Sequence, residues 1–310
     1  PGGALLPRAE GPMLSQARRG IRAGNDVILA ALALLAALAL LVLRVPAPFS
    51  VLAAGALALA MPLWTRHAPA LSDLSALAGD PFTNPYFRKL DELTRAGLAA
   101  AGGRYWVGYP DLHPSFDCVA AWCGAETLLF AMAVEPETLA PILELSVRDF
   151  QRIFGHFHDC LAAAGQPSVT WINLPCRGRF HVPSCDTSSM FSPAHFNELV
   201  LPLLRREMHG MDRAVYHVDG KGVAQHLDTI LAQPDIQAIQ WVQGVGTDWP
   251  ILQWIPLLKR VLATGRSVMV DVPLAELDDF IARMPREGVF LCLGVDDADQ
   301  EAVLRRVERW

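Results

Sequence analysis

The stretch from Asp212 to Gly246 constrains the fold most strongly, because strand, turn and helix patterns follow one another within it. Arg213–Asp219 is predicted as a strand, Val223–Leu231 as a helix and Ile236–Val242 as a second strand. Glycines between the first strand and the helix break the strand pattern. A strand, a helix and a strand in such close succession form a βαβ unit, so we expect the two strands to lie parallel in one sheet.

The same alternation of strands and helices runs through most of the chain. Counting one uncertain segment at the start, the predicted strands are Leu57–Trp64, Arg104–Tyr109, Ser168–Leu174, Phe180–Asp186, Arg213–Asp219, Ile236–Val242, Ser267–Val272 and Val289–Leu293. The predicted helices are Pro85–Leu98, Asp117–Phe130, Pro136–Ala164, Pro193–His209, Val223–Leu231, Ile251–Ala263, Leu274–Met284 and a last one from Ala298. Eight strands alternating with helices predict a (β/α)8 barrel over residues 61–310.

An apolar N-terminal segment, residues 1–60, precedes this predicted barrel. Val27–Leu43 is an unbroken apolar run, slightly shorter than the ~20 residues that span a bilayer, and Arg18, Arg19 and Arg22 come shortly before it. One interpretation is a membrane anchor, with association through residues 26–64 and the basic residues on the cytoplasmic side. The other is a buried helical hairpin, and hydropathy alone leaves both open.

Charge and cysteine content exclude several classes of protein. The net charge is −6 and the basic residues are scattered, so we expect no nucleic-acid binding. Six cysteines at irregular spacing, with no CxxC pair, do not form a disulfide framework. We therefore expect a reducing, cytoplasmic location, with the membrane-anchored form as the alternative.

Candidate catalytic residues gather where the predicted strands end. Side chains alternate across a strand, so His217 and Asp219 share one face of Arg213–Asp219. Gln240 lies near the end of the next strand and is a candidate for substrate binding. Chemistry in α/β sheets collects at the carboxyl ends of strands. An imidazole and a carboxylate here suit a metal site or an acid–base pair; the alternative is a structural hydrogen bond.

Other candidates lie at neighbouring strand ends. Cys185 and Asp186 can supply a metal ligand and a catalytic carboxylate, or they are a buried cysteine and a capping aspartate. Asp111 is a candidate for substrate binding in the loop after Arg104–Tyr109. Arg177 and Arg179 can bind substrate carboxylates, although exposed arginines are common on any surface.

His156, His158 and Cys160 look like a metal cluster in the sequence but fall within a predicted helix. Residues two positions apart on a helix do not face each other. We interpret these three as surface and core residues rather than as ligands.

The central motifs also carry a family resemblance. The segments YHVDGKGVAQHLDTIL, IQAIQWVQGVG and SCDTSSMFSPAHFNELVLPLL resemble the uroporphyrinogen decarboxylase superfamily, in its branch of corrinoid-linked methyltransferases. The resemblance runs from about Pro62 to the C-terminus and implies a (β/α)8 barrel. It does not include the arginine-rich N-terminal motif of the decarboxylase itself, so it supports the superfamily more than that reaction.

The resemblance implies an enzyme that transfers a methyl group between a small substrate and a cobalamin carrier, with a corrinoid protein as partner. Methyltransferases of this branch hold zinc with a His-x-Cys pair and a later cysteine. In this chain Asp219 stands where the first cysteine would be, beside His217, and Cys185 or Cys292 would complete the zinc ligands.

Two other functions stay open. A decarboxylase of a tetrapyrrole-like substrate would use Asp186 or Asp219 to stabilise a pyrrole cation. Arg177 and Arg179 would then bind the substrate's carboxylates, and no cofactor would be needed. The third interpretation is a barrel that binds a ligand without catalysis.

Overall fold

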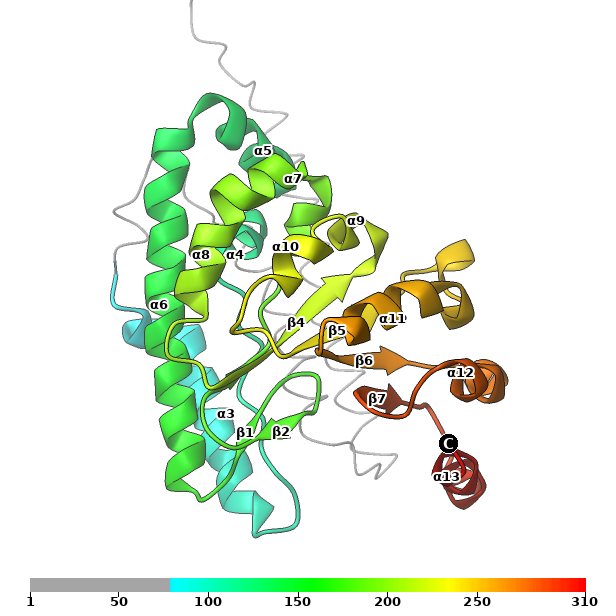
Figure 1. Ribbon diagram of the computed structural model, residues 1–310. Coiled ribbons are helices and arrows are strands. Elements are labelled where there is room, and N and C mark those ends of the chain that lie inside the picture. The colour runs from blue at the N-terminus through cyan, green and yellow to red at the C-terminus, as the bar shows by residue number, and fades with distance from the viewer. Residues whose placement is uncertain (1–78) are drawn as a thin grey trace, which may run out of the picture. The chain divides into compact units, whose positions relative to one another are not determined.

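Five parallel strands organise the part of the protein that the computed structural model describes, residues 79–310 (Figure 1). They are hydrogen-bonded in chain order: β3 (Phe180–His181), β4 (Arg213–Asp219), β5 (Ala238–Val242), β6 (Ser267–Asp271) and β7 (Val289–Cys292). The predicted α/β fold with a parallel sheet is therefore confirmed. A closed eight-stranded barrel is not shown by these residues and stays a prediction.

The predicted βαβ unit is present, with one difference in its helix. The strand β4 has the predicted bounds, and β5 begins at Ala238, two residues later than predicted. The helix between them is interrupted and forms α9 (Gly220–Ala224) and α10 (Leu227–Leu231). Gly220 follows Asp219 directly and has a φ of 69°, a left-handed conformation that lets the chain turn out of the sheet.

Nine further α-helices precede, separate or follow these strands along the described part of the chain. Before the sheet come α3 (Pro85–Ala101), α4 (Ser115–Cys123), α5 (Ala125–Val134) and α6 (Pro136–Ala163). Between and after the strands come α7 (Pro193–His195), α8 (Leu201–Glu207), α11 (Ile255–Ala263), α12 (Leu277–Arg283) and α13 (Gln300–Glu308). The predicted start of the first helix is confirmed, because the Asn84 side chain accepts a hydrogen bond from the N–H of Tyr86.

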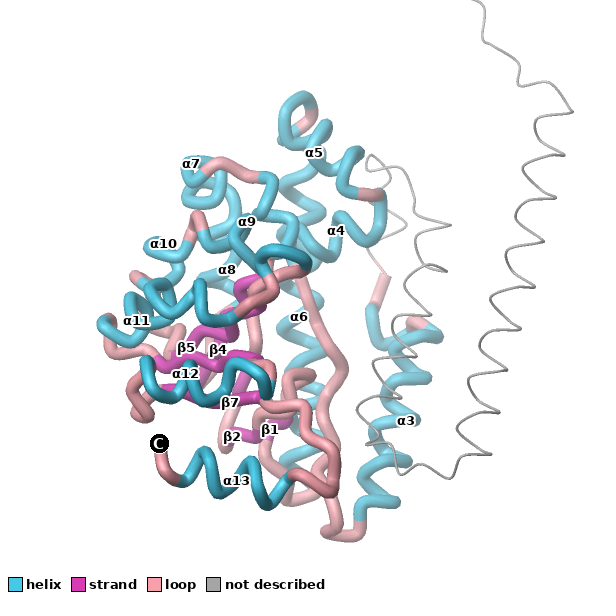
Figure 2. Tube along the Cα trace, turned by 90° about the vertical axis from the view of Figure 1, so that its right-hand side faces the viewer, coloured by secondary structure: helices cyan, strands magenta, loops and turns pink. Residues whose placement is uncertain are grey.

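One face of the sheet, the helix face, packs in one apolar cluster with helices that include α8 to α12, whereas α3 packs with α6 in a separate cluster (Figure 2). Its buried side chains include Tyr216 and Val218 of β4 and Ile239 and Trp241 of β5. The opposite face carries a smaller apolar cluster made of Ile172, Phe180, Val182, Val215 and Met269. We call it the site face, because His217 shares it with Val215.

Two predicted strands before β3 differ from the structure. Arg104–Tyr109 forms no strand, although the N–H of Tyr109 donates to the carbonyl of Val169 at 3.1 Å. Ser168–Leu174 was predicted as one strand, but only β1 (Ser168–Val169) forms, and the chain turns back to make an antiparallel pair with β2 (Pro175–Cys176). Asn173, with a φ of 59°, lies in that turn.

A second correction concerns the predicted helix Asp117–Phe130. It is broken at Gly124, which has a φ of 85°, so that α4 and α5 meet at an angle of 114°. Within residues 79–310 no single helix is long and apolar enough to cross a membrane, whereas the bent pair α4–α5 passes that test of length and composition. The apolar segment of residues 1–60, the segment 26–64 and the predicted strand Leu57–Trp64 lie outside the described residues.

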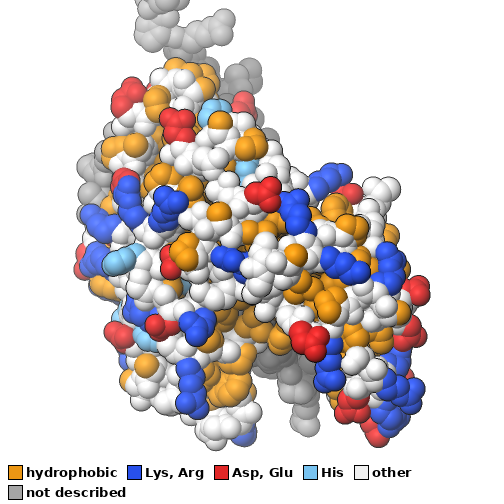
Figure 3. All heavy atoms as spheres, in the orientation of Figure 1, with side chains coloured by type: hydrophobic (Ala, Val, Ile, Leu, Met, Phe, Trp, Pro, Cys, Tyr) orange, Lys and Arg blue, Asp and Glu red, His pale blue; other side chains and the backbone are white. Residues whose placement is uncertain are grey.

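Acidic and basic side chains are interspersed on the surface in view in Figure 3. Among the described residues, several opposite charges pair across short distances, such as Arg152 with Asp80 at 2.7 Å and Arg260 with Asp228 at 2.7 Å. This arrangement agrees with the scattered charge of the sequence. Such exposed pairs contribute about 0–1 kcal/mol each, so the apolar helix face contributes far more to stability.

Replacing Trp241 tests how far stability depends on the helix face. The Trp241 side chain is fully buried and its ring lies 4.8 Å from that of Trp254. We expect Trp241→Ala to lower the free energy of unfolding by about 3–5 kcal/mol in urea denaturation. The matched control is Trp249→Ala, since Trp249 is 52% exposed; its effect should stay within about 0.5 kcal/mol. Equal effects of the two substitutions would contradict this packing.

Candidate functional site

His217 and Asp219 lie on the site face at the carboxyl end of β4, as their alternation with Tyr216 and Val218 predicts. His217 is 9% exposed, whereas Asp219 is exposed at the strand's end. On the neighbouring strand β5, Gln240 is the residue paired with His217. An imidazole, a carboxylate and an amide therefore meet at the carboxyl edge of the sheet.

The His217 ring is held from two sides. Its Nδ1–H donates a hydrogen bond to Oε1 of Gln240 at 2.8 Å. The indole of Trp171 packs edge-on against the ring, with centroids 5.2 Å apart. Because an amide oxygen only accepts, this bond places the ring proton on Nδ1 and leaves the lone pair of a neutral imidazole on Nε2.

That lone pair faces two carboxylates. Nε2 of His217 lies 3.8 Å from Oδ1 of Asp186. One ligand atom from each of Asp186, His217 and Asp219 lies within 4.8 Å of the other two. One nitrogen and two oxygen donors at such separations fit a divalent cation, which zinc, manganese or iron can supply.

Asp186 is positioned by a network that starts on α4. The carboxylate of Asp117 accepts hydrogen bonds from the N–H of Asp186, the N–H of Thr187 and the hydroxyl of Thr187, at 2.9, 2.9 and 2.6 Å. The hydroxyl of Ser184 donates to Oδ1 of Asp186 at 2.7 Å. These bonds fix the backbone at the start of the turn Asp186–Met190, so that the Asp186 carboxylate is directed toward His217.

A close approach of two backbones holds this turn against the βαβ unit. A Cβ atom at Gly222, in α9, would lie 2.7 Å from the side chain of Ser189. Only glycine permits such an approach. Glycine at position 222 therefore allows the turn Asp186–Met190 to lie beside β4, which carries His217.

The electrostatics of the cluster favour a bound cation. Partial burial raises the pKa of the Asp186 carboxyl, and repulsion from Asp117 and Asp219 adds to the increase. The hydrogen bond from Ser184 and the charge of His217 act in the opposite direction. Several carboxylates close to one imidazole repel one another, and a divalent ion would relieve that repulsion.

Asp111 belongs to the same region through His113 and Trp171. His113 Nε2 lies 2.6 Å from Oδ1 of Asp111, and the His113 ring lies 5.9 Å from that of Trp171. Burial alone would lower the pKa of His113, but the contact with Asp111 and nearby acidic groups together raise it to about 9. At neutral pH His113 is thus a cation, and its ring and that of His217 both contact the Trp171 indole.

Cys185 and Cys292 do not join the three-ligand cluster. Cys185 packs into the core of the helix face, and burial raises the pKa of its thiol well above the ordinary value. Cys292 ends β7 beside Asp271, and burial raises its pKa to about 11. Both thiols are therefore protonated at neutral pH, and the ligand set that the structure brings together has no sulfur.

Arg177 and Arg179 lie at the other end of the sheet. The carbonyl of Arg179 accepts hydrogen bonds from the backbone of Asp212 and Arg213, where β4 begins. With a rise of about 3.3 Å per residue, that end lies roughly 20 Å from Asp219. Arg177 borders a cavity of about 760 Å³ near Trp106. The structure thus separates these arginines from His217.

Trp171 and Asp117 are parts of the site that no sequence pattern indicates. Trp171 was expected within a strand, but it lies in the turn between β1 and β2 and contacts both His113 and His217. Its buried indole N–H has no hydrogen-bond partner among the described residues. Asp117 stands in the first turn of α4, where an acidic residue is common, so its sequence position gave no signal of a role beyond the helix.

Comparisons with protein-family models, with curated proteins and with solved structures find no match to this chain.

The raised pKa of His113 predicts a specific dependence of stability on pH. A histidine whose pKa rises from 6.5 to about 9 on folding contributes stability that is complete below about pH 6.5 and is lost by about pH 9. We expect the native protein to lose more unfolding free energy over this window than His113→Gln does. Urea denaturation at several pH values measures the difference. The control is His209→Gln, at an exposed position, which should behave like the native protein. If the unfolding free energies of the native protein and His113→Gln changed equally with pH, His113 would not have the raised pKa.

Proposed function

We propose that this protein is an enzyme of the uroporphyrinogen decarboxylase superfamily that transfers a methyl group between a small substrate and a corrinoid carrier. The observation that carries the proposal is the convergence of His217, Asp186 and Asp219 at the carboxyl edge of the parallel sheet, with donor atoms within 4.8 Å of one another. This edge is where α/β enzymes place their reacting groups. The sequence resemblance supplies the reaction class.

The proposal includes a (β/α)8 barrel, of which the five parallel strands form a part. Strands in chain order, with helical crossovers between them, place their helices on one face, as in a barrel. The site face would then line the barrel's interior. On the β3 side, the hydroxyl of Tyr109 donates to the carbonyl of Phe180 at 2.9 Å, and the strands that would close the barrel are part of the proposal.

The residues of the site fit a bound divalent ion, with zinc as the first candidate. His217 Nε2 and the carboxylates of Asp186 and Asp219 would hold it, and Gln240 would keep the imidazole in the ligating tautomer. Such an ion lowers the pKa of a bound hydroxyl or amine and so supplies a nucleophile. A ligand set without thiolate is harder than a cysteine-rich one, so we propose an oxygen or nitrogen group, rather than a thiol, as the methyl-carrying or methyl-accepting atom.

Two further groups, His113 and Trp171, have roles that do not depend on the ion. The cationic His113 would attract an anionic substrate group, and Trp171 would form an apolar wall between the two histidines. All six cysteines are unpaired, which fits the proposed cytoplasmic location.

Tetrapyrrole decarboxylation is less well supported. That reaction needs cationic groups for the substrate's carboxylates beside the catalytic aspartate. Arg177 and Arg179, the candidates for this role, lie at the amino end of the sheet, roughly 20 Å from Asp219 by strand rise. The methyl-transfer proposal makes no use of them.

Methylcobalamin tests the proposal directly. Incubation of the zinc-loaded protein with methylcobalamin and alcohol or amine acceptors should change the corrinoid absorbance as the cobalt–carbon bond breaks. We expect His217→Ala to slow this change by about 10²- to 10⁴-fold, the contribution of a positioned acid–base or ligand group. His195→Ala is the matched control, because His195 is exposed on α7.

Two outcomes would contradict the proposal. Accumulation of a coproporphyrin-type product from a tetrapyrrole substrate would identify a decarboxylase. Unchanged corrinoid absorbance with every acceptor, or equal rates for His217→Ala and the native protein, would favour a ligand-binding barrel or a different reaction centre.

The role of Gln240 gives a further prediction. Gln240→Leu removes the acceptor of the Nδ1–H of His217 while leaving all three proposed ligands in place. We expect zinc affinity at this site to fall about 10- to 100-fold, as for other partners of metal-ligating histidines. A competition assay with a chromogenic chelator measures the change, and Gln225→Leu, at an exposed position, is the control. Unaltered affinity would show that Gln240 does not orient the imidazole.

A further inference from the structure

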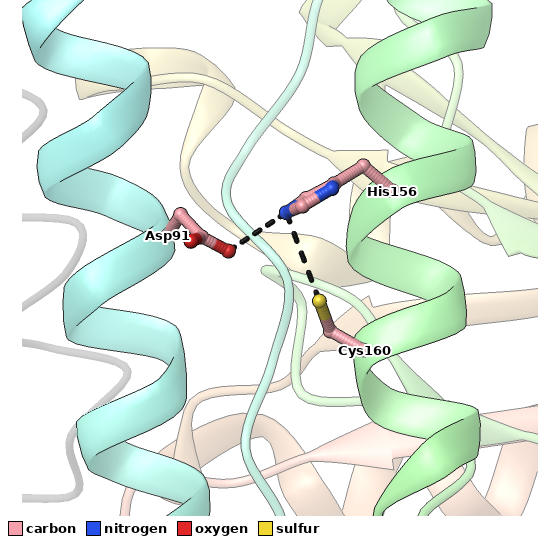
Figure 4. Close-up of side chains that lie close together, drawn as sticks. All are labelled: Asp91, His156 and Cys160. Carbon is pink, nitrogen blue, oxygen red and sulfur yellow. Dashed lines mark hydrogen bonds and ion pairs between the residues drawn. The ribbon is translucent and has the colours of Figure 1, made fainter. Parts of the chain in front are cut away.

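A second cluster of ligand-type side chains lies between α3 and α6, away from the sheet (Figure 4). His156 and Cys160 are four residues apart on α6, so they share one face of that helix. Asp91 projects toward them from α3. Sequence spacing favours surface and core roles for His156, His158 and Cys160, because residues two apart on a helix do not face each other. His156 and Cys160 are four apart, however, and Asp91 joins them from a segment distant in sequence.

The distances within this cluster are short. Nε2 of His156 lies 2.7 Å from Oδ1 of Asp91 and 3.7 Å from Sγ of Cys160. All three donor atoms lie within 4.8 Å of one another. The side chains of His156 and Asp91 are 26% and 23% exposed, so the cluster is largely shielded yet open to small ions.

Aromatic rings fix the position of the imidazole. The His156 ring lies 5.7 Å from Phe82, 5.1 Å from Phe87 and 5.3 Å from Phe157, measured between ring centroids. These rings come from the turn before α3, from α3 itself and from α6. A histidine held in this way loses little conformational entropy when it binds a ligand.

We propose that Asp91, His156 and Cys160 form a second metal site, which takes a borderline divalent cation of the zinc class. Nitrogen, sulfur and oxygen donors together suit zinc better than magnesium or calcium, which prefer oxygen alone. Three protein ligands and one water would give the usual four-coordinate geometry. The ion would join α3 to α6. This site is independent of the proposed enzymatic function.

The geometry needs only a small adjustment. Bonds of about 2.0 Å to nitrogen and oxygen and about 2.3 Å to sulfur put tetrahedral donors about 3.3 Å apart for nitrogen and oxygen and about 3.5 Å apart when one of them is sulfur. The separation of 3.7 Å between His156 and Cys160 comes close to this value. The hydrogen bond between His156 and Asp91 must open by about half an ångström. On metal binding the thiol proton passes to solvent, and the imidazole keeps one proton, on Nδ1, so that Nε2 is free to ligate.

Arg95 supports one ligand and competes for another. Its Nε donates to Oδ2 of Asp91 at 2.9 Å, the oxygen that does not face His156. This hydrogen bond orients the carboxylate, as groups that hydrogen-bond to metal ligands commonly do. It is also the largest effect that lowers the pKa of Asp91. Its Nη2 lies 3.6 Å from Sγ of Cys160 and must move on metal binding. Arg95 is 58% exposed and has room in solvent for that movement.

Cobalt(II) titration of the full chain tests the proposal, because a cobalt–thiolate bond gives a charge-transfer absorption band that nitrogen and oxygen ligands do not. We expect one equivalent of cobalt to produce this band in the native protein. Cys160→Ser and His156→Ala should abolish it. The band should persist in His217→Ala, which removes a ligand of the other site, and in Cys176→Ser, which removes a different partly buried cysteine.

The outcomes separate the two sites. A native protein without the band, or a Cys160→Ser variant that keeps it, would overturn the proposal whatever the result for His217. Because Cys160→Ser changes one atom, circular dichroism should show an intact fold even if His156→Ala is destabilised.

Thermal unfolding offers a second readout. An ion that binds only the folded state stabilises it by mass action, so zinc at about 100 times its dissociation constant should raise Tm by about 4–5 °C. The part of this shift that depends on Cys160 should disappear in Cys160→Ser and remain in Cys176→Ser. An equal shift in both variants would show that zinc does not join α3 and α6.

Discussion

The register between β4 and β5 is the constraint on which the candidate site depends. It pairs His217 with Gln240 on the site face and places Val218 and Trp241 together on the helix face. A slip of one residue would turn the imidazole into the apolar core and expose the indole. Burial of Trp241 therefore stabilises the same arrangement that aims Nε2 of His217 at Asp186. Packing on the helix face thus fixes the strand register, and the register determines which side chains lie on the site face.

The site also depends on groups that never touch a substrate. Asp117 accepts three hydrogen bonds from Asp186 and Thr187, and the absence of a side chain at Gly222 lets α9 approach Ser189. Together they bring a carboxylate from one loop beside a histidine from one strand. Carboxylates placed around an imidazole repel one another, so the proposed divalent ion would relieve a repulsion that is built into this arrangement.

The sequence predicts local features well and contacts between distant segments poorly. β4 has its predicted bounds because its length, its alternation and the glycines that end it all act within a few residues. Trp171 was misplaced because a turn at Asn173 replaces the expected strand. The pairing of Asp91 with His156 and the distance of Arg177 from His217 arise from the packing of separate elements, which no local pattern encodes.

Diffraction from zinc-soaked crystals, with data collected at the zinc absorption edge, tests the central claim most directly. The account predicts an anomalous peak bounded by Nε2 of His217 and the carboxylates of Asp186 and Asp219, with Gln240 bonded to Nδ1. A His217 ring buried among the helices, or a fully occupied zinc elsewhere with no peak at the end of β4, would contradict it.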